Sequence, residues 1–258
     1  MKTLKIIVLG ASGPYPGSDD LPSVLVAYGK NVILLDAGEG VQHRMKKCGY
    51  SVARVKTVMI SHLHGDHVLG LLPLLQSRSL GGCKDKLHII GPPGIREFIE
   101  DNMHLLKFEP VYDIVIDETL KHEFTINRDV HVQVFPVEHV VPTVAYAIHV
   151  SNIRLVYITD TRPLNEFPEA AVEPDVLIHD STFAYDMRDK AREYGHSTSV
   201  DAARVAASLR AKLLLLYLIS PRYRNRIQLL FEARRFFENT YVAEQYLKVL
   251  VLKKSAKL

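Results

Sequence analysis

The run His62-Leu63-His64-Gly65-Asp66-His67 constrains this chain more than any other feature. It places four metal-capable side chains within six residues, directly after the apolar run Val55–Ile60. Imidazole and carboxylate groups are ligands of zinc and similar transition metals, and they leave the ion able to act as a Lewis acid. Because the ligands alternate with Leu63 and Gly65, they can converge from one side of a loop. The pattern therefore predicts a metal site after a strand, rather than a merely polar turn.

Apolar runs of strand length and helical patterns alternate along the rest of the chain. Runs rich in Val and Ile, several of them punctuated by Gly, Pro, Asn or Asp, predict strands over Ile6–Leu9, Val24–Tyr28, Val32–Leu35, Val55–Ile60, Leu87–Ile90, Val130–Val137, Val144–Val150, Arg154–Ile158, Val176–Ile178 and Lys212–Ile219. Helical spacing predicts helices over Gly40–Cys48, Val68–Ser79, Gly94–Leu106, Ser199–Leu209 and Ile227–Glu238. The mixture indicates an α/β protein, and the absence of a repeat or linker predicts a single domain over 1–258.

His-x-His-x-Asp-His after a hydrophobic strand resembles the signature of the metallo-β-lactamase superfamily. Further blocks, in the same order along the chain, resemble ribonuclease Z, the tRNA 3′-processing endonuclease family. These blocks are Leu9-Gly10-Ala11-Ser12-Gly13, Asp36-Ala37-Gly38-Glu39-Gly40-Val41-Gln42-His43, Ser77-Arg78-Ser79, Asp160-Thr161-Arg162-Pro163, His179-Asp180-Ser181-Thr182, Gly195-His196-Ser197-Thr198 and Ser220-Pro221-Arg222-Tyr223. The resemblance implies an αβ/βα sandwich of two mixed sheets with helices outside.

The resemblance also implies the metal ligands, with Zn²⁺ as the expected ion and Mn²⁺ as a possible one. His62, His64 and His139 would hold the first ion, and Asp160 would bridge it to a second. Asp66 and His67 would complete the second site. For Asp160 a different role is open from the sequence alone, since Asp before a turn with Pro163 is also a good helix N-cap.

By the same resemblance, catalysis falls to Asp66, His196 and Asp180. Asp66 would accept a proton from the bridging water. His196 is the expected general acid, because the pKa of histidine lies near neutrality. Asp180 stands where the family usually has glutamate, and its shorter side chain would orient His196. The phosphate and RNA contacts expected from the last block are Ser220, Arg222 and Tyr223, since Arg recognises phosphate and Tyr can stack a base.

Two features depart from the family pattern. The histidine that completes the second metal site in the family corresponds to Leu218, and leucine cannot ligate, so one or two ions are expected. The long tRNA-binding arm of the family is also missing, because only 20 residues separate His139 from Asp160. The stretch 80–125, or the tail with Lys253, Lys254 and Lys257, is a candidate substitute.

Three functions remain open on these grounds. The first is an endonuclease that removes 3′ trailers from precursor tRNA, and the missing arm favours a second, a phosphodiesterase for small or cyclic substrates. The third is an RNA-binding paralogue with impaired catalysis, which Leu218 supports.

The net charge of +3 does not by itself indicate nucleic acid, and no apolar run approaches the roughly 18 residues that span a bilayer. With two cysteines in no metal or disulfide pattern, a cytoplasmic protein is expected. The resemblance implies a homodimer.

Overall fold

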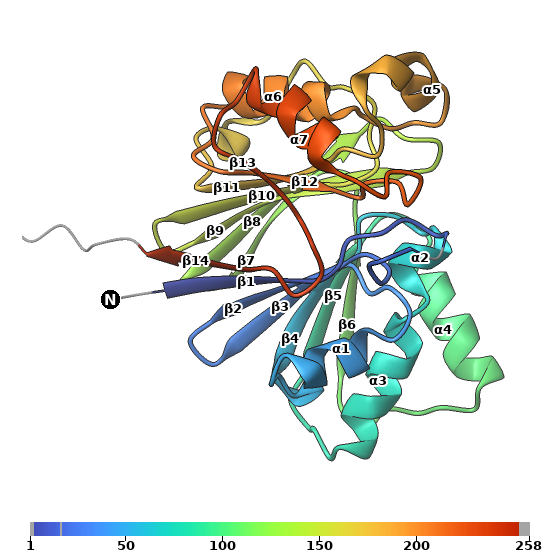
Figure 1. The fold of residues 1–258 in the computed structure, drawn as a ribbon. Helices are drawn as coiled ribbons and strands as arrows, with labels where there is room; N and C mark the ends of the chain where they lie inside the picture. Colours follow the sequence, from blue (N-terminus) through green and yellow to red (C-terminus); the bar gives the residue numbers. More distant parts are fainter. Residues whose placement is uncertain (1–2, 16, 253–258) are drawn as a thin grey trace, which may run out of the picture. The chain divides into compact units, whose positions relative to one another are not determined.

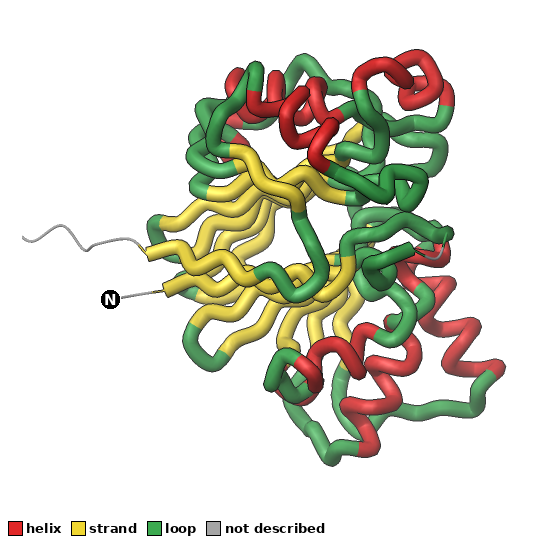
Figure 2. Tube along the Cα trace, viewed as in Figure 1, coloured by secondary structure: helices red, strands yellow, loops and turns green. Residues whose placement is uncertain are grey.

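The computed structural model describes residues 3–15 and 17–252. The described residues divide into two compact units, the first built from residues 3–10, 19–119 and 245–252 and the second from residues 11–15, 17–18 and 120–244. Each unit contains one mixed sheet of seven strands with helices (Figure 1, Figure 2). The tail with Lys253, Lys254 and Lys257 lies outside the described residues. None of the helices in the described ranges has the length and apolar character needed to cross a membrane.

The sheet of the first unit has the order β14-β1-β2-β3-β4-β5-β6. Pairing is antiparallel from β14 to β3 and parallel from β3 to β6. Apolar faces of the helices and strands form one buried core. The strands are β1 (Thr3–Gly10), β2 (Ser23–Tyr28), β3 (Asn31–Leu35), β4 (Val55–Met59), β5 (Leu87–Gly91), β6 (Ile114–Glu118) and β14 (Lys248–Leu252). The helices are α1 (Val41–Lys47), α2 (Gly65–Val68), α3 (Leu71–Leu80) and α4 (Ile95–Leu105), with a 3-10 turn η1 (Val52–Arg54).

The sheet of the second unit has the order β13-β12-β11-β10-β9-β8-β7. Pairing is antiparallel from β7 to β10 and parallel from β10 to β13. The strands are β7 (His122–Asn127), β8 (Val130–Val137), β9 (Thr143–Val150), β10 (Ile153–Ile158), β11 (Val176–Asp180), β12 (Leu214–Tyr217) and β13 (Thr240–Val242). The helices are α5 (Arg188–Glu193), α6 (Ser199–Ser208) and α7 (Ile227–Arg234), with 3-10 turns η2 (Glu169–Ala171) and η3 (Tyr185–Met187).

Helix α6 shows how the sequence specifies an element of the second unit. Its buried Ala202, Ala203 and Ala206 recur at helical spacing and join the apolar core of the sheet. Thr198 caps the helix, accepting a hydrogen bond from the backbone N–H of Asp201, whose side chain accepts from the backbone N–H of Thr198. This reciprocal capping box satisfies two N–H groups that the first turn leaves without partners. The predicted start of this helix is thereby confirmed.

Every strand predicted from the sequence is present, but four strands and helix α5 were missed, and two predicted helices differ from the observed ones. The missed strands are β6, β7, β13 and β14. β13 has only three residues, and β7 is largely exposed and carries Glu123, Thr125 and Asn127 among its apolar residues. The last predicted helix ends at Arg234 rather than at Glu238.

The sequence predicted one continuous helix over Val68–Ser79, but the structure has two helices there, α2 and α3, with a break at Gly70. The backbone N–H of Gly70 donates to the carbonyl of Ala37 at 2.8 Å, which draws this turn against the loop after β3. A Cβ at Gly70 would lie 2.1 Å from the carbonyl oxygen of Gly38. Only glycine allows this close approach of two backbones.

Candidate metal centre and catalytic residues

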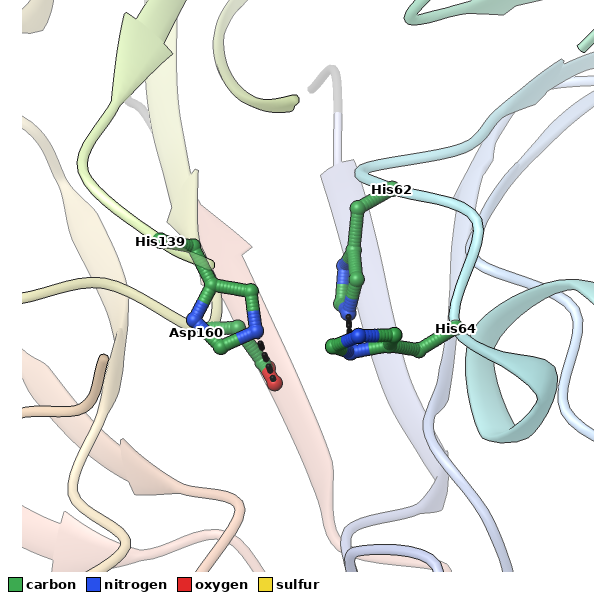
Figure 3. Close-up of side chains that lie close together, drawn as sticks. All are labelled: His62, His64, His139 and Asp160. Atoms are coloured by element: carbon green, nitrogen blue, oxygen red, sulfur yellow. Dashed lines mark hydrogen bonds and ion pairs between the residues drawn. The ribbon is translucent and has the colours of Figure 1, made fainter. Parts of the chain in front are cut away.

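The histidine-rich run forms the loop and short helix that follow β4. His62 is fully buried, and its Nε2 lies 3.0 Å from Nδ1 of His64, with the two rings at 79° (Figure 3). Two neutral imidazoles whose nitrogens converge in this way offer two ligands to one ion. The other nitrogen of His62, Nδ1, lies 3.0 Å from the hydroxyl of Ser61, which helps to fix the orientation of the ring.

Asp36, which directly follows β3, holds this loop in place. Its buried carboxylate accepts hydrogen bonds from the backbone N–H of Ser61 at 2.7 Å and from the Ser61 hydroxyl at 2.9 Å. It also lies 2.8 Å from Nδ1 of the buried His67. Asp36 begins one of the family blocks of the sequence, and the resemblance alone gave it no role, although a carboxylate directly after a buried strand is a signal of a site.

His67 and Asp66 form a second pair of donors in the same unit. Because Nδ1 of His67 donates to Asp36, the lone pair of the neutral ring is on Nε2, which lies 3.6 Å from the carboxylate of Asp66. A carboxylate behind a histidine is the arrangement that fixes the tautomer and raises the basicity of metal-binding histidines. The two residues assigned to the second metal therefore present their donor atoms together.

The second unit contributes a further pair, His139 and Asp160. His139 lies beyond the end of β8, and its Nδ1 donates to the carbonyl of Gly195 at 2.7 Å. Its Nε2 then carries the lone pair and lies 3.7 Å from the carboxylate of Asp160. Figure 3 shows the two side chains facing one another. Asp160 follows β10 with a positive φ of 29°, and no helix begins there, so the alternative of a helix N-cap is wrong.

Asp180 and His196 lie in direct contact in the same unit. Oδ2 of Asp180 is 3.0 Å from Nδ1 of His196, and the carboxylate also accepts hydrogen bonds from the backbone N–H groups of Thr161, Thr182 and Ser197. Burial alone would raise the pKa of Asp180, but His196 and the hydrogen bonds from Thr182 and Thr161 hold it below its ordinary value. An ionised Asp180 keeps the proton of His196 on Nδ1 while it faces the carboxylate, which directs Nε2 towards other partners. The shorter side chain of aspartate thus reaches His196, and its catalytic role stays a prediction.

The Ser220-Pro221-Arg222-Tyr223 segment presents one exposed cation. Nε of Arg222 donates to the Ser220 hydroxyl at 2.9 Å, and its guanidinium lies 4.8 Å from the centre of the Phe183 ring. The hydroxyl of Tyr223 accepts from the backbone N–H of Ala184 at 3.0 Å. The Tyr223 side chain therefore supports its own unit, and the stacking of a base on it stays a prediction.

Comparison with known proteins decides the family. A profile of the β-lactamase superfamily domain matches residues 31–217. The ribonuclease Z of Ignicoccus hospitalis is 33% identical over 98% of this chain and 100% of its own length, and that of Picrophilus torridus is 34% identical over 98% and 97%. The solved structure of the short form of human tRNase Z has a TM-score of 0.83 and 26% identity, covering 95% of this chain and 98% of that one. The chain belongs to the ribonuclease Z family.

Family membership confirms the predicted fold class, the metallo-β-lactamase fold with two mixed sheets of seven strands and accompanying helices. Relative to the ribonuclease Z of Ignicoccus hospitalis this chain is short. The alignment runs over 300 positions, more than the 258 residues of this chain, so the relative carries residues without a counterpart here. Between His139 and Asp160 the chain has room only for the hairpin of β9 and β10.

Leu218 is the residue that the sequence resemblance places where the family is expected to have a metal-binding histidine. It is buried, directly follows β12, and has a φ of 61°, in the left-handed region. A bulky L-residue adopts this conformation at a cost of roughly 1–2 kcal/mol. The surrounding structure, and not the preference of leucine, must therefore impose the backbone conformation at this position.

Proposed function

We propose that this chain is a metal-dependent endonuclease that removes 3′ trailers from precursor tRNA. The observation that carries the proposal is the presence of the donor pairs His62–His64 and His139–Asp160 in a chain that matches ribonuclease Z over almost its whole length. Imidazole and carboxylate donors suit a hydrolytic transition-metal ion. The protein would work in the cytoplasm as a homodimer.

The first ion would be held by His62, His64, His139 and Asp160. Zinc is the ion that best suits three histidines and a carboxylate, with Mn²⁺ as the alternative. Asp66 and His67, with Asp160 shared, would hold a second ion at lower occupancy, because Leu218 has no donor atom. Bound metal would supply a water of lowered pKa and would neutralise charge on the phosphoryl oxygens.

The residues of this chain would divide the remaining work. Asp66 would accept the proton of the attacking water, whose oxygen forms a bond to phosphorus. The bond from phosphorus to the 3′ oxygen breaks, and His196, oriented by Asp180, would protonate that oxygen. Arg222 would bind a phosphate beside the scissile one. The products would be tRNA with a 3′ hydroxyl and a trailer with a 5′ phosphate.

Two other functions have a specific observation in their favour. The short connection between His139 and Asp160, with no arm, favours a phosphodiesterase for small or cyclic substrates. Leu218 favours an RNA-binding paralogue with impaired catalysis. Both predict that precursor tRNA is not cut, but only the small-substrate enzyme hydrolyses a cyclic nucleotide or bis(p-nitrophenyl) phosphate.

The deciding experiment is incubation with a precursor tRNA that carries a 3′ trailer, with Zn²⁺ or Mn²⁺, and mapping of the cut by fragment length. We expect one cut after the discriminator base, abolished in His64→Ala and retained in His104→Ala, which removes an exposed histidine of α4. No cut with enzyme in excess over RNA would refute the proposal. Hydrolysis of the small substrates would then decide between the other two functions.

A further inference from the structure

A strip of arginines and aromatic rings lies on the surface of the second unit. The guanidinium of Arg204, on α6, lies 5.6 Å from the centre of the Tyr185 ring and 4.9 Å from that of Phe236, just beyond α7. The guanidinium of Arg188, at the start of α5, lies 5.5 Å from the same Tyr185 ring. The elements that carry the strip, η3, α5, α6 and α7, belong to one unit, with α6 and α7 side by side (Figure 1). We refer to these four residues as the arginine strip.

The ring contacts hold the two guanidinium groups without using their hydrogen-bond donors. In the part of the chain that the structure describes, Arg204 is exposed and its guanidinium makes no hydrogen bond or ion pair. Arg188 has only a 3.8 Å ion pair with its exposed neighbour Asp189, a pair that contributes little in water. Stacking on rings preorganises an arginine side chain while its planar fork of N–H donors remains available for phosphate.

A carboxylate that contacts the backbone of Tyr185 is already engaged with groups of its own unit. Glu232 accepts hydrogen bonds from the backbone N–H of Tyr185 at 2.9 Å, from the hydroxyl of Ser199 at 3.0 Å and from the amide of Gln228 at 2.9 Å. In residues 185–204 and 222–238 the other exposed arginines are at positions 192, 222, 224, 234 and 235, against exposed acids at 186, 189, 193 and 238. The charge of the strip and its surroundings is therefore complementary to a polyanion.

The arginine strip is continuous with the candidate catalytic residues. Met187, between Tyr185 and Arg188 in the sequence, has its sulfur 3.6 Å from a terminal nitrogen of Arg222 and 3.5 Å from the hydroxyl of Tyr223. Arg222 stacks on Phe183, whose ring centre is 6.1 Å from that of His196. A line of contacts within one unit thus joins the proposed general acid to the arginine strip.

We infer that the arginine strip binds the sugar–phosphate backbone of the acceptor end of tRNA. The inference rests on the proposed function, in which His196 protonates the 3′ oxygen that leaves with the tRNA body. The side chains that connect His196 to the arginine strip should therefore face the tRNA body and not the 3′ trailer. Phosphate contacts of this kind give affinity that does not depend on sequence and that falls with salt.

The test measures binding of mature tRNA that ends at the discriminator base, because it lacks a trailer and cannot be cut. For Arg188→Gln/Arg204→Gln we expect the dissociation constant at about 0.1 M salt to rise roughly 10- to 100-fold, and the slope of its logarithm against log salt to fall by about two. Arg204→Lys, which keeps the charge, should retain most of that slope. The matched control is Arg128→Gln, which removes a highly exposed arginine from the turn between β7 and β8.

Equal affinity of the double variant and the Arg128→Gln control for mature tRNA would overturn the inference. So would a loss of affinity for the precursor alone, since that result would assign the strip to the trailer. Melting temperatures within a few degrees of each other would show that the variants fold. Cleavage of the precursor by the unaltered protein tests the proposed function separately. Binding of mature tRNA that depends on the two arginines, without cleavage of the precursor, would refute the proposed function and would support the binding role of the arginine strip.

Discussion

Gly195→Ala is a sharp test of the metal centre because it should displace one proposed metal ligand, His139, without replacing any of the ligands. Gly195 has a φ of 78°, and a Cβ added there would lie 2.7 Å from Nδ1 of His139. The same glycine provides the carbonyl that accepts the hydrogen bond of His139 at 2.7 Å. The left-handed conformation should cost alanine roughly 1–2 kcal/mol, which leaves a domain with a typical stability of about 5–15 kcal/mol folded. Displacing His139 from its carbonyl should lower metal affinity by about 10- to 100-fold, the usual effect of losing such a supporting contact.

The control for this substitution is Gly49→Ala. Gly49 has nearly the same φ, 79°, but a Cβ there would meet nothing within 4 Å. Both variants should therefore lose similar stability in urea unfolding of the metal-free proteins, and only Gly195→Ala should lose metal affinity, measured by competition with a chelator. Equal metal affinity in the two variants would refute the role assigned to the contact between Gly195 and His139.

Three further predictions concern other residues of the second unit. Leu218→His should raise the metal content per chain, measured by elemental analysis; unchanged content and activity would contradict the account of a depleted second site. Asp180→Asn should lower the turnover of precursor tRNA by about 10²- to 10⁴-fold, because His196 loses its orienting carboxylate. It should affect bis(p-nitrophenyl) phosphate much less, since that leaving group needs no proton, and equal losses would exclude a general-acid pathway. Burial lowers the pKa of His179, so the unfolded chain takes up a proton first as pH falls. Its contribution to stability should be complete above the model-peptide pKa of about 6.5 and should decline below it by up to about 1.4 kcal/mol per pH unit. Urea unfolding with chelator should show a flatter profile for His179→Asn, and identical profiles would contradict the assignment.

The candidate metal ligands and catalytic residues could be predicted from the sequence because metal ligands cluster at recognisable spacings. The dense run from His62 to His67 is visible without any structure, the family blocks contain Asp160 and His196, and the family resemblance implies His139. The residues that hold these side chains were harder to find. Gly195 acts through a backbone carbonyl and through the space that a missing Cβ leaves, and neither property has a spacing rule. The role of Asp36 depends on a carboxylate reaching Ser61 and His67 across sequence separations of 25 and 31 residues.

The two sheets have the same succession of pairings, and the aspartates that follow two corresponding strands share a left-handed backbone conformation. In each unit three antiparallel pairings are followed by three parallel ones, so β3 corresponds to β10, and β5 to β12. Asp36 directly follows β3 and Asp160 follows β10, both with positive φ, at the carboxyl ends where parallel strands gather ligands. The sequence shows no repeat, because the two units share backbone topology and not residues. Aspartate enters the left-handed region readily, whereas leucine does not. Leu218 nevertheless has this conformation after β12, whereas the residue after the corresponding strand β5, Pro92, does not, so the shared topology does not account for it. A histidine introduced there should take up the same backbone conformation at no greater cost than leucine, because histidine is one of the residues enriched in the left-handed region.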